Sequence, residues 1–139
     1  MEAAAVANEF IEAFNDADWG RFTATCSADV VYEEKGSNRT IIGRDAVLEV
    51  AKGWRAAFPD IRGKISCSTV AGSTASLEIT WIATHNGPLE LPSGKLPPTG
   101  KAVEVEAVQV FVVEGGKVVR MRHYLDFMTM LTQLGVIPA

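Results

Sequence analysis

The chain has 139 residues, and its 13 lysines and arginines against 17 aspartates and glutamates give a net charge of −4. This length predicts one domain over residues 1–139. The sequence has no basic stripe, which argues against nucleic acid or an anionic membrane as a partner, and no apolar run long enough to span a bilayer.

The cysteines and the first residues bear on metal binding and location. Cys26 and Cys67 have no CxxC spacing, and with two histidines the chain contains no zinc-ligand pattern. We expect both thiols to be reduced, as in a cytoplasmic protein. The first ten residues, MEAAAVANEF, lack the basic n-region of a secretory signal. The sequence therefore predicts a cytoplasmic protein without a bound metal.

The first half of the chain predicts three helices and a short hairpin. Apolar residues recur at helical spacing in the first and third of these helices, and Gly36-Ser37-Asn38 is typical of a turn between two short strands. The helices are expected at residues 3–15, 19–26 and 43–58, and the hairpin strands at 30–35 and 39–42.

The second half predicts strands, which begin with two at 61–69 and 73–85. A long loop rich in glycine and proline follows over 86–100. Two alternating runs then flank Glu114-Gly115-Gly116, which is typical of a hairpin turn, and a short helix over 127–134 closes the chain. Helices followed by strands predict an α+β fold. We expect a cone, in which N-terminal helices cover a curved antiparallel sheet and enclose a pocket.

The last hairpin places one polar residue on each of its otherwise apolar inward faces. Side chains alternate between the faces of a strand, and this puts Gln109 on the first inward face and His123 on the second. If Val113 lies opposite Val119, counting back along both strands brings Gln109 opposite His123. Two polar side chains on an apolar wall need a partner, a water or a substrate. The pattern therefore predicts a site.

The remaining candidates for the site are bulky inward side chains. We expect the pocket to be lined by Phe14, Trp19, Tyr32, Trp54, Phe58, Trp81, Phe111, Met121 and His123. Such aromatic residues equally suit a filled core. His85 ends its strand beside the long loop, where it either shapes the pocket mouth or anchors the loop. Asp126 precedes the last helix, where an N-cap and a direct acid–base role are both open.

Several short motifs occur in a fixed order along most of the chain. They are Ala57-Phe58-Pro59-Asp60, Thr84-His85-Asn86-Gly87-Pro88-Leu89, Leu96-Pro97-Pro98-Thr99-Gly100-Lys101, Gly116-Lys117-Val118, and Asp126 through Gln133-Leu134-Gly135. Together they resemble the SnoaL-like polyketide cyclases, also called ester cyclases, of the NTF2-like superfamily. The resemblance implies an α+β cone that is often dimeric or tetrameric. It also implies kinship with enzymes that close a polyketide ring by cofactor-free intramolecular aldol condensation.

The resemblance assigns the family's acid–base positions to residues that differ from the family's own. Its catalytic aspartate corresponds to His123, its assisting histidine to Gln109 and a pocket asparagine to Tyr32. A neutral imidazole can abstract a proton α to a carbonyl, and the Gln109 amide can orient it or donate to the enolate oxygen. A buried His–Gln hydrogen bond that only sets the strand register is the structural alternative.

The leading hypothesis is a cofactor-independent enzyme that transfers protons on a small hydrophobic carbonyl substrate, as a polyketide cyclase does. Ketosteroid-isomerase-like double-bond migration would use the same pocket, although the inward pair lacks a carboxylate base beside a Tyr/Asp oxyanion pair. Epoxide opening would need an inward Asp–Arg–Asp cluster, which the sequence does not provide. A non-catalytic domain for small-ligand binding or association is the competing class.

Two surface segments carry further expectations. The outer face of the last hairpin mixes charged residues with Val108, Val110, Val112 and Tyr124, which predicts a homodimer or higher homo-oligomer whose interface covers part of this face. The loop over 86–100 carries Leu89, Leu91 and Leu96, which favour burial over disorder. These leucines either close over the pocket as a lid or pack against a partner subunit.

Overall fold

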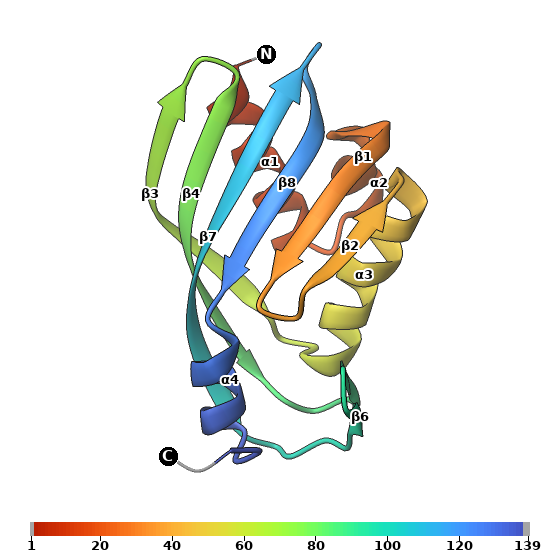
Figure 1. The fold of residues 1–139 in the computed structure, drawn as a ribbon, viewed down its shortest axis with the longest axis vertical. Coiled ribbons are helices and arrows are strands. Elements are labelled where there is room, and N and C mark those ends of the chain that lie inside the picture. The colour runs from red at the N-terminus through yellow and green to blue at the C-terminus, as the bar shows by residue number, and fades with distance from the viewer. Residues whose placement is uncertain (1, 138–139) are drawn as a thin grey trace.

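The computed structural model describes residues 2–137, which form four helices and eight strands (Figure 1). The helices are α1 (Ala3–Asn15), α2 (Trp19–Ala24), α3 (Arg44–Ala57) and α4 (Phe127–Gln133). The main sheet contains β1 (Cys26–Lys35), β2 (Arg39–Ile42), β3 (Arg62–Ala71), β4 (Thr74–Thr84), β7 (Ala102–Glu114) and β8 (Lys117–Leu125). A separate two-stranded sheet comprises β5 (Leu89–Leu91) and β6 (Gly94–Leu96).

The main sheet has the strand order β2-β1-β8-β7-β4-β3 and stays open, with β2 and β3 at its edges. In Figure 1 the helices α1 to α3 lie behind the curved sheet, and α4 lies at its lower end. Helix α1 packs against β3, β4 and β7, and α3 packs against β1 and β2. The predicted α+β cone is therefore confirmed. No helix within residues 2–137 is long and apolar enough to cross a membrane.

One pair of neighbouring strands departs from the antiparallel sheet that we expected. Strands β1 and β8 run parallel, and Tyr32 is paired with Met121 and Glu34 with His123. Parallel neighbours require a long connection, and here it consists of everything between β1 and β8. This pairing joins the N-terminal half of the chain to the last hairpin and brings Tyr32 close to His123.

The register of the last hairpin confirms the predicted pair but not the premise behind it. Gln109 lies opposite His123, as expected. Val113, however, is paired with Val118 and not with Val119, because the register shifts between Val112 and Val113. Such a bulge adds one residue to one strand and rotates the faces beyond it. It lies at the turn end of the hairpin, so the pairing nearer to the site is unaffected.

The second helix and the first strand meet earlier than predicted. Helix α2 ends at Ala24, where the Thr25 hydroxyl donates to the carbonyl of Phe22 at 2.7 Å. Strand β1 then begins at Cys26 rather than at residue 30. Its pairing with β8 shifts register between Cys26 and Val31, and this irregularity removes the simple alternation on which strand prediction relies.

Residues 86–100 are not the structureless loop that the sequence predicts. They contain the β5–β6 hairpin, in which Leu89 is paired with Leu96 around a turn where Gly94 has φ of 124°. Leu89 is buried, and Leu91 and Leu96 pack against the core of the same chain. Three-residue strands are too short for an alternation signal, and this is why glycine and proline dominated the prediction.

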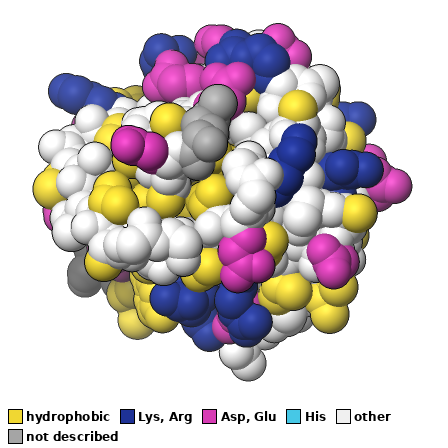
Figure 2. All heavy atoms as spheres, turned by 90° about the horizontal axis from the view of Figure 1, so that it is seen from above, with side chains coloured by type: hydrophobic (Ala, Val, Ile, Leu, Met, Phe, Trp, Pro, Cys, Tyr) yellow, Lys and Arg dark blue, Asp and Glu magenta, His cyan; other side chains and the backbone are white. Residues whose placement is uncertain are grey.

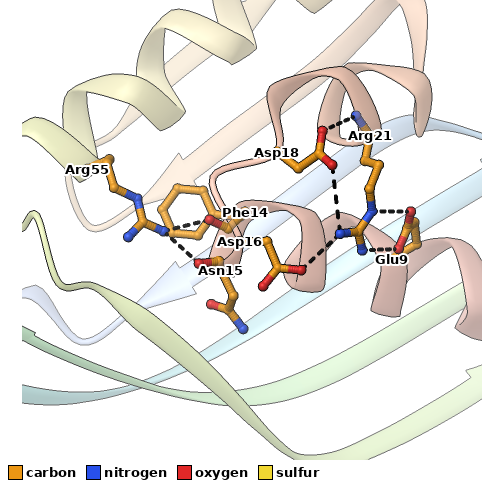
Figure 3. A network of polar contacts seen from close by, with 7 residues as sticks. All are labelled: Glu9, Phe14, Asn15, Asp16, Asp18, Arg21 and Arg55. Carbon is orange, nitrogen blue, oxygen red and sulfur yellow. Dashed lines mark hydrogen bonds and ion pairs between the residues drawn. The ribbon is translucent and has the colours of Figure 1, made fainter.

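Two arginines hold the helices at one end of the cone (Figure 3). Arg55 of α3 donates from Nη2 to the carbonyl of Phe14 at 2.6 Å, and its guanidinium lies 5.0 Å from the centre of the Phe14 ring. Arg21 of α2 forms ion pairs with Glu9 at 2.8 Å and Asp16 at 2.9 Å. The Arg55 contacts fix the end of α1, and with it the position of Phe14.

Candidate active site

An apolar cavity lies between the helices and the inner face of the sheet. Its volume is about 70 Å³, which is room for several waters. Its aromatic lining consists of Phe10, Phe14, Phe22, Tyr32, Trp54, Phe58 and Trp81. Gln109 and His123 also line it. The cavity thus combines an apolar wall with a few convergent polar groups, as small-molecule sites do.

Four residues that we expected in the pocket do not line this cavity. Phe111 and Met121 face inward, but they are fully buried where α1 covers the sheet, and the ring of Phe111 lies 5.4 Å from that of Phe10. Trp19 packs against Phe14 at 6.1 Å between ring centres. His85, the fourth, contacts Phe58 from outside the lining. An inward-facing side chain therefore does not always line the cavity, because packed side chains fill part of the cone.

His123 lies in the middle of the candidate site, only 6% exposed. Its Nδ1 is 2.9 Å from the hydroxyl oxygen of Tyr32, and its Nε2 accepts a hydrogen bond from Trp81 Nε1 at 3.3 Å. Trp81 lies directly over Gly63 of β3, where an added Cβ would come within 2.6 Å of the indole ring. The bare backbone at Gly63 therefore allows the indole to lie close to β3.

Glu34 is a buried carboxylate that sequence reasoning did not single out. Its side chain is 1% exposed and pairs with Arg39 of β2, whose Nε lies 2.7 Å from Oε1. Its Oε2 accepts from the Tyr32 hydroxyl at 2.8 Å and from Trp54 Nε1 at 3.1 Å. Alternation along β1 could have revealed it, because residue 34 shares the inward face with Tyr32.

Burial and charge set the protonation states of this group. Burial lowers the pKa of His123 to about 4, although the negative charge of Glu34 acts in the opposite direction. Burial also raises the pKa of Glu34, but hydrogen bonds from Arg39 and Ser37 outweigh that effect and leave the pKa below its ordinary value. Burial, followed by the charge of Glu34, raises the pKa of Tyr32 well above its ordinary value. At neutral pH the site thus holds a neutral imidazole, a phenol and a carboxylate.

Gln109 lies beside His123 but does not hydrogen-bond to it. Its Nε2 donates to the thioether sulfur of Met121 at 3.4 Å. A thioether is a weak acceptor, so a carbonyl oxygen would be a better partner for this N–H. The buried His–Gln hydrogen bond that we considered is absent from the contacts of the described residues.

Asp126 and His85 have structural partners outside the cavity. Asp126 is the N-cap of α4 and accepts from the backbone N–H of Thr129 at 3.1 Å and from its hydroxyl at 2.6 Å. These bonds lower the pKa of Asp126. His85 is buried, and its Nδ1 accepts from the backbone N–H of Thr99 at 3.1 Å, which ties together the two ends of the segment that contains β5 and β6.

The two histidines are also kept from the surface. No histidine is visible on the face in Figure 2, where basic and acidic side chains surround apolar ones. His85 and His123 are both buried. Within residues 2–137, no group of three or more His, Cys, Asp or Glu side chains is placed to hold a metal ion.

The sequence comparison identifies the family. The pattern of the SnoaL-like polyketide cyclases matches residues 4–134, so the chain belongs to this family, as its motifs predicted. No curated protein matches the sequence significantly.

Similar solved structures agree with this assignment. AclR of Streptomyces galilaeus, described as a candidate hydroxylase, is 26% identical with a TM-score of 0.82 and covers 99% of this chain and 83% of its own. IdmH of Streptomyces antibioticus, a candidate polyketide cyclase, is 24% identical with a TM-score of 0.81 over 97% and 99%. A candidate SnoaL-like cyclase from Jannaschia sp. CCS1 reaches a TM-score of 0.86 at 18% identity over 98% and 93%. These proteins share a fold, but their names state different reactions, hydroxylation for one and polyketide cyclisation for the others.

Proposed function

We propose that this protein is a cofactor-independent acid–base enzyme that acts on a small hydrophobic carbonyl compound, in the manner of a polyketide cyclase. One observation supports this proposal above the others. A neutral, buried imidazole and an amide donor line the same apolar cavity, on the paired residues His123 and Gln109. A general base beside a hydrogen-bond donor is the minimum needed to form an enolate.

The proposed reaction begins with proton abstraction by Nε2 of His123. The proton comes from the carbon α to a carbonyl, and the electron pair of the broken C–H bond moves onto the carbonyl oxygen to form an enolate. Gln109 Nε2 leaves the Met121 sulfur, 3.4 Å away, and donates to this oxygen. Trp81 lies 3.3 Å from the basic nitrogen, and the substrate must displace this long hydrogen bond to reach it.

The second half of the reaction forms the ring. The enolate carbon attacks a second carbonyl of the same substrate, so a C–C bond forms and the second carbonyl becomes an alkoxide. The His123 imidazolium returns the proton to that alkoxide, which restores the neutral base. Protons and electrons balance without an oxidant or a cofactor. The aromatic lining favours a substrate with apolar or aromatic surface.

The alternative functions differ from ring closure either in where the abstracted proton goes or in the first chemical step. A ketosteroid-isomerase-like double-bond shift begins with the same abstraction and returns the proton to another carbon. Epoxide opening has less support, because no Asp or Arg is among the described residues that line the cavity. A binding domain without catalysis would hold the same ligands without exchanging their protons.

The test is proton exchange in D2O, followed by proton NMR on hydrophobic ketones and 1,3-diketones. We expect the wild-type protein to accelerate α-proton exchange above the buffer rate, and His123→Ala to abolish the acceleration. Asp126→Asn is the matched control, because Asp126 caps α4 outside the cavity. Ligand binding without exchange would overturn the enzyme proposal and favour the binding domain.

We further infer that the protein forms a homodimer through the outer face of β7 and β8 and works in the cytoplasm. Val108 and Tyr124 are paired on that face and are 36% and 47% exposed. Exposed apolar neighbours of this kind favour association.

Both cysteines, Cys26 and Cys67, are free thiols, in keeping with a reducing compartment.

A further inference from the structure

Glu34 carries a charge beside the candidate site without reaching the cavity. It is not among the lining residues, and its contacts are with Arg39, Ser37, Trp54 and Tyr32. Of these, Tyr32 alone also contacts His123. Any influence that Glu34 has on His123 by hydrogen bonding must therefore pass through the Tyr32 hydroxyl.

The direction of each hydrogen bond follows from what each group can donate. An indole N–H only donates, so Trp81 fixes Nε2 of His123 as an acceptor. In a neutral imidazole the proton must then be on Nδ1, and Nδ1–H donates to the Tyr32 oxygen. The Tyr32 hydroxyl is thus free to donate to the ionised Glu34. One arrangement of protons satisfies all three contacts.

We propose that Glu34 is a positioning residue that acts through Tyr32, and that this relay, together with the Trp81 N–H, holds His123 with its proton on Nδ1 and its lone pair on Nε2. This inference rests on the proposed function for its catalytic meaning, but the relay itself exists without a substrate. Neither Glu34 nor Tyr32 exchanges a proton with the substrate in this scheme.

The relay has a consequence for the protonated state of His123. When Nε2 takes up a proton, the imidazolium keeps its Nδ1–H bond to Tyr32, and the negative charge of Glu34 lies beyond the phenol. A carboxylate oriented in this way favours the imidazolium and makes the base stronger. Burial acts in the opposite direction, so Glu34 offsets part of the cost of charging His123.

Few other charges face this group. Across the sheet His123 faces neutral Gln109 on β7 and neutral Trp81 on β4. On the side of β1 it faces Tyr32, with Glu34 and Arg39 behind. Arg39 is 40% exposed along its side chain, whereas Glu34 is 1% exposed, so solvent screens the arginine more than the carboxylate. Glu34 is thus the charge that His123 senses through Tyr32.

The test is the tautomer and titration of His123, measured by nitrogen-15 NMR on the full chain without substrate. In the wild-type protein we expect Nδ1 protonated and Nε2 bare at neutral pH. Tyr32→Phe removes the acceptor, so we expect the preference for this tautomer to fall about tenfold or more. Glu34→Gln removes the charge but keeps the shape, so His123 should protonate at a lower pH than in the wild type.

Ser37→Ala is the matched control. Ser37 donates to Oε1 of Glu34 at 2.7 Å, whereas the relay uses Oε2, and Arg39 still pairs with Glu34 in this variant. It should leave the tautomer of His123 unchanged. A wild-type His123 protonated on Nε2, or a Tyr32→Phe variant with the wild-type tautomer ratio, would overturn the relay.

The two proposals fail in different ways. If the NMR result holds but no ketone exchanges protons, the relay stands and the proposed function fails. If exchange occurs and His123 has the opposite tautomer, the function stands and the relay fails. Where both hold, Tyr32→Phe should lower the exchange rate about tenfold and shift its pH profile, whereas Ser37→Ala should not.

Discussion

Gln109 and His123 lie directly opposite each other on β7 and β8, yet the Gln109 amide donates to the sulfur of Met121 and not to the imidazole. The imidazole takes its partners from other strands, Tyr32 of β1 and Trp81 of β4. Gln109 therefore keeps an N–H on a weak acceptor, which a substrate carbonyl could take over, whereas both nitrogens of His123 already have partners. Variants of each residue can test these roles.

Gln109→Leu should lower kcat/KM for the carbonyl substrate by about 10²–10³-fold, the usual loss when one donor to a developing oxyanion is removed. Leucine keeps most of the side-chain volume, so the fold should survive. Met121→Leu is the matched control, because it removes the present acceptor and leaves the donor in place. Steady-state kinetics measure kcat/KM for both variants. Equal values for Gln109→Leu and the wild type would remove Gln109 from the mechanism.

His123→Ala should lower kcat by about 10²-fold or more, as expected when a positioned general base is lost. His123→Asp is the more instructive variant, because it introduces the aspartate that the family resemblance assigns to this position. We expect it to recover part of the lost rate, with a pH profile that follows the carboxyl group. Intact turnover by His123→Ala on the true substrate would contradict the assignment.

The depressed pKa of His123 predicts a pH-dependent stability. Its pKa is about 4 in the folded protein against an ordinary 6.5, so the unfolded chain binds more protons between these values. Neutral His123 makes its full contribution to the free energy of unfolding above pH 6.5. This contribution, about 2–3 kcal/mol, is lost as the pH falls toward 4. Urea unfolding at pH 7 and 4.5 should show the wild-type protein losing this much more than His123→Gln. Equal losses of stability in the wild type and in His123→Gln would contradict the lowered pKa of His123.

The outer face of the last hairpin should mediate self-association. Val108→Glu with Tyr124→Ser should convert the expected dimer into a monomer, because it adds charge and removes apolar area at two paired residues. Light scattering at tens of micromolar measures the mass. Met128→Ser is the control, since Met128 is 69% exposed and belongs to α4 rather than to the hairpin. A wild-type protein that is strictly monomeric would rule out the interface.

The β5–β6 hairpin should control access to the cavity. Leu89 packs in the core and β5 contacts α3, the helix that contributes Trp54 to the cavity lining. Leu89→Ser with Leu91→Ser should loosen this cover and raise KM for a hydrophobic substrate while the oligomer stays intact. Lys95→Ala in the same hairpin is the exposed control. Dissociation of the dimer with an unchanged KM would place the hairpin in the interface instead.

Sequence alone determined the order of the elements outside residues 86–100 and the face of each strand in the last hairpin. Alternation is local, so it placed Gln109 and His123 inward, and the opposing register followed even though the bulge at Val119 was invisible. The motif order identified the family because several short segments had to agree at once. These features depend on neighbours along the chain or on one hairpin, which is why they were readable.

The tertiary structure alone decided which inward residues face open space and which groups meet. Phe111 and Met121 point inward, but α1 fills the space above them, so they belong to the core and not to the cavity. Glu34 becomes a buried, charged group because donors from the turn, from β2 and from α3 converge on it. The link from Glu34 through Tyr32 to His123 spans 91 residues between its last two members. Such contacts arise from the parallel pairing of β1 with β8, and pairing between distant strands is set by packing rather than by local pattern.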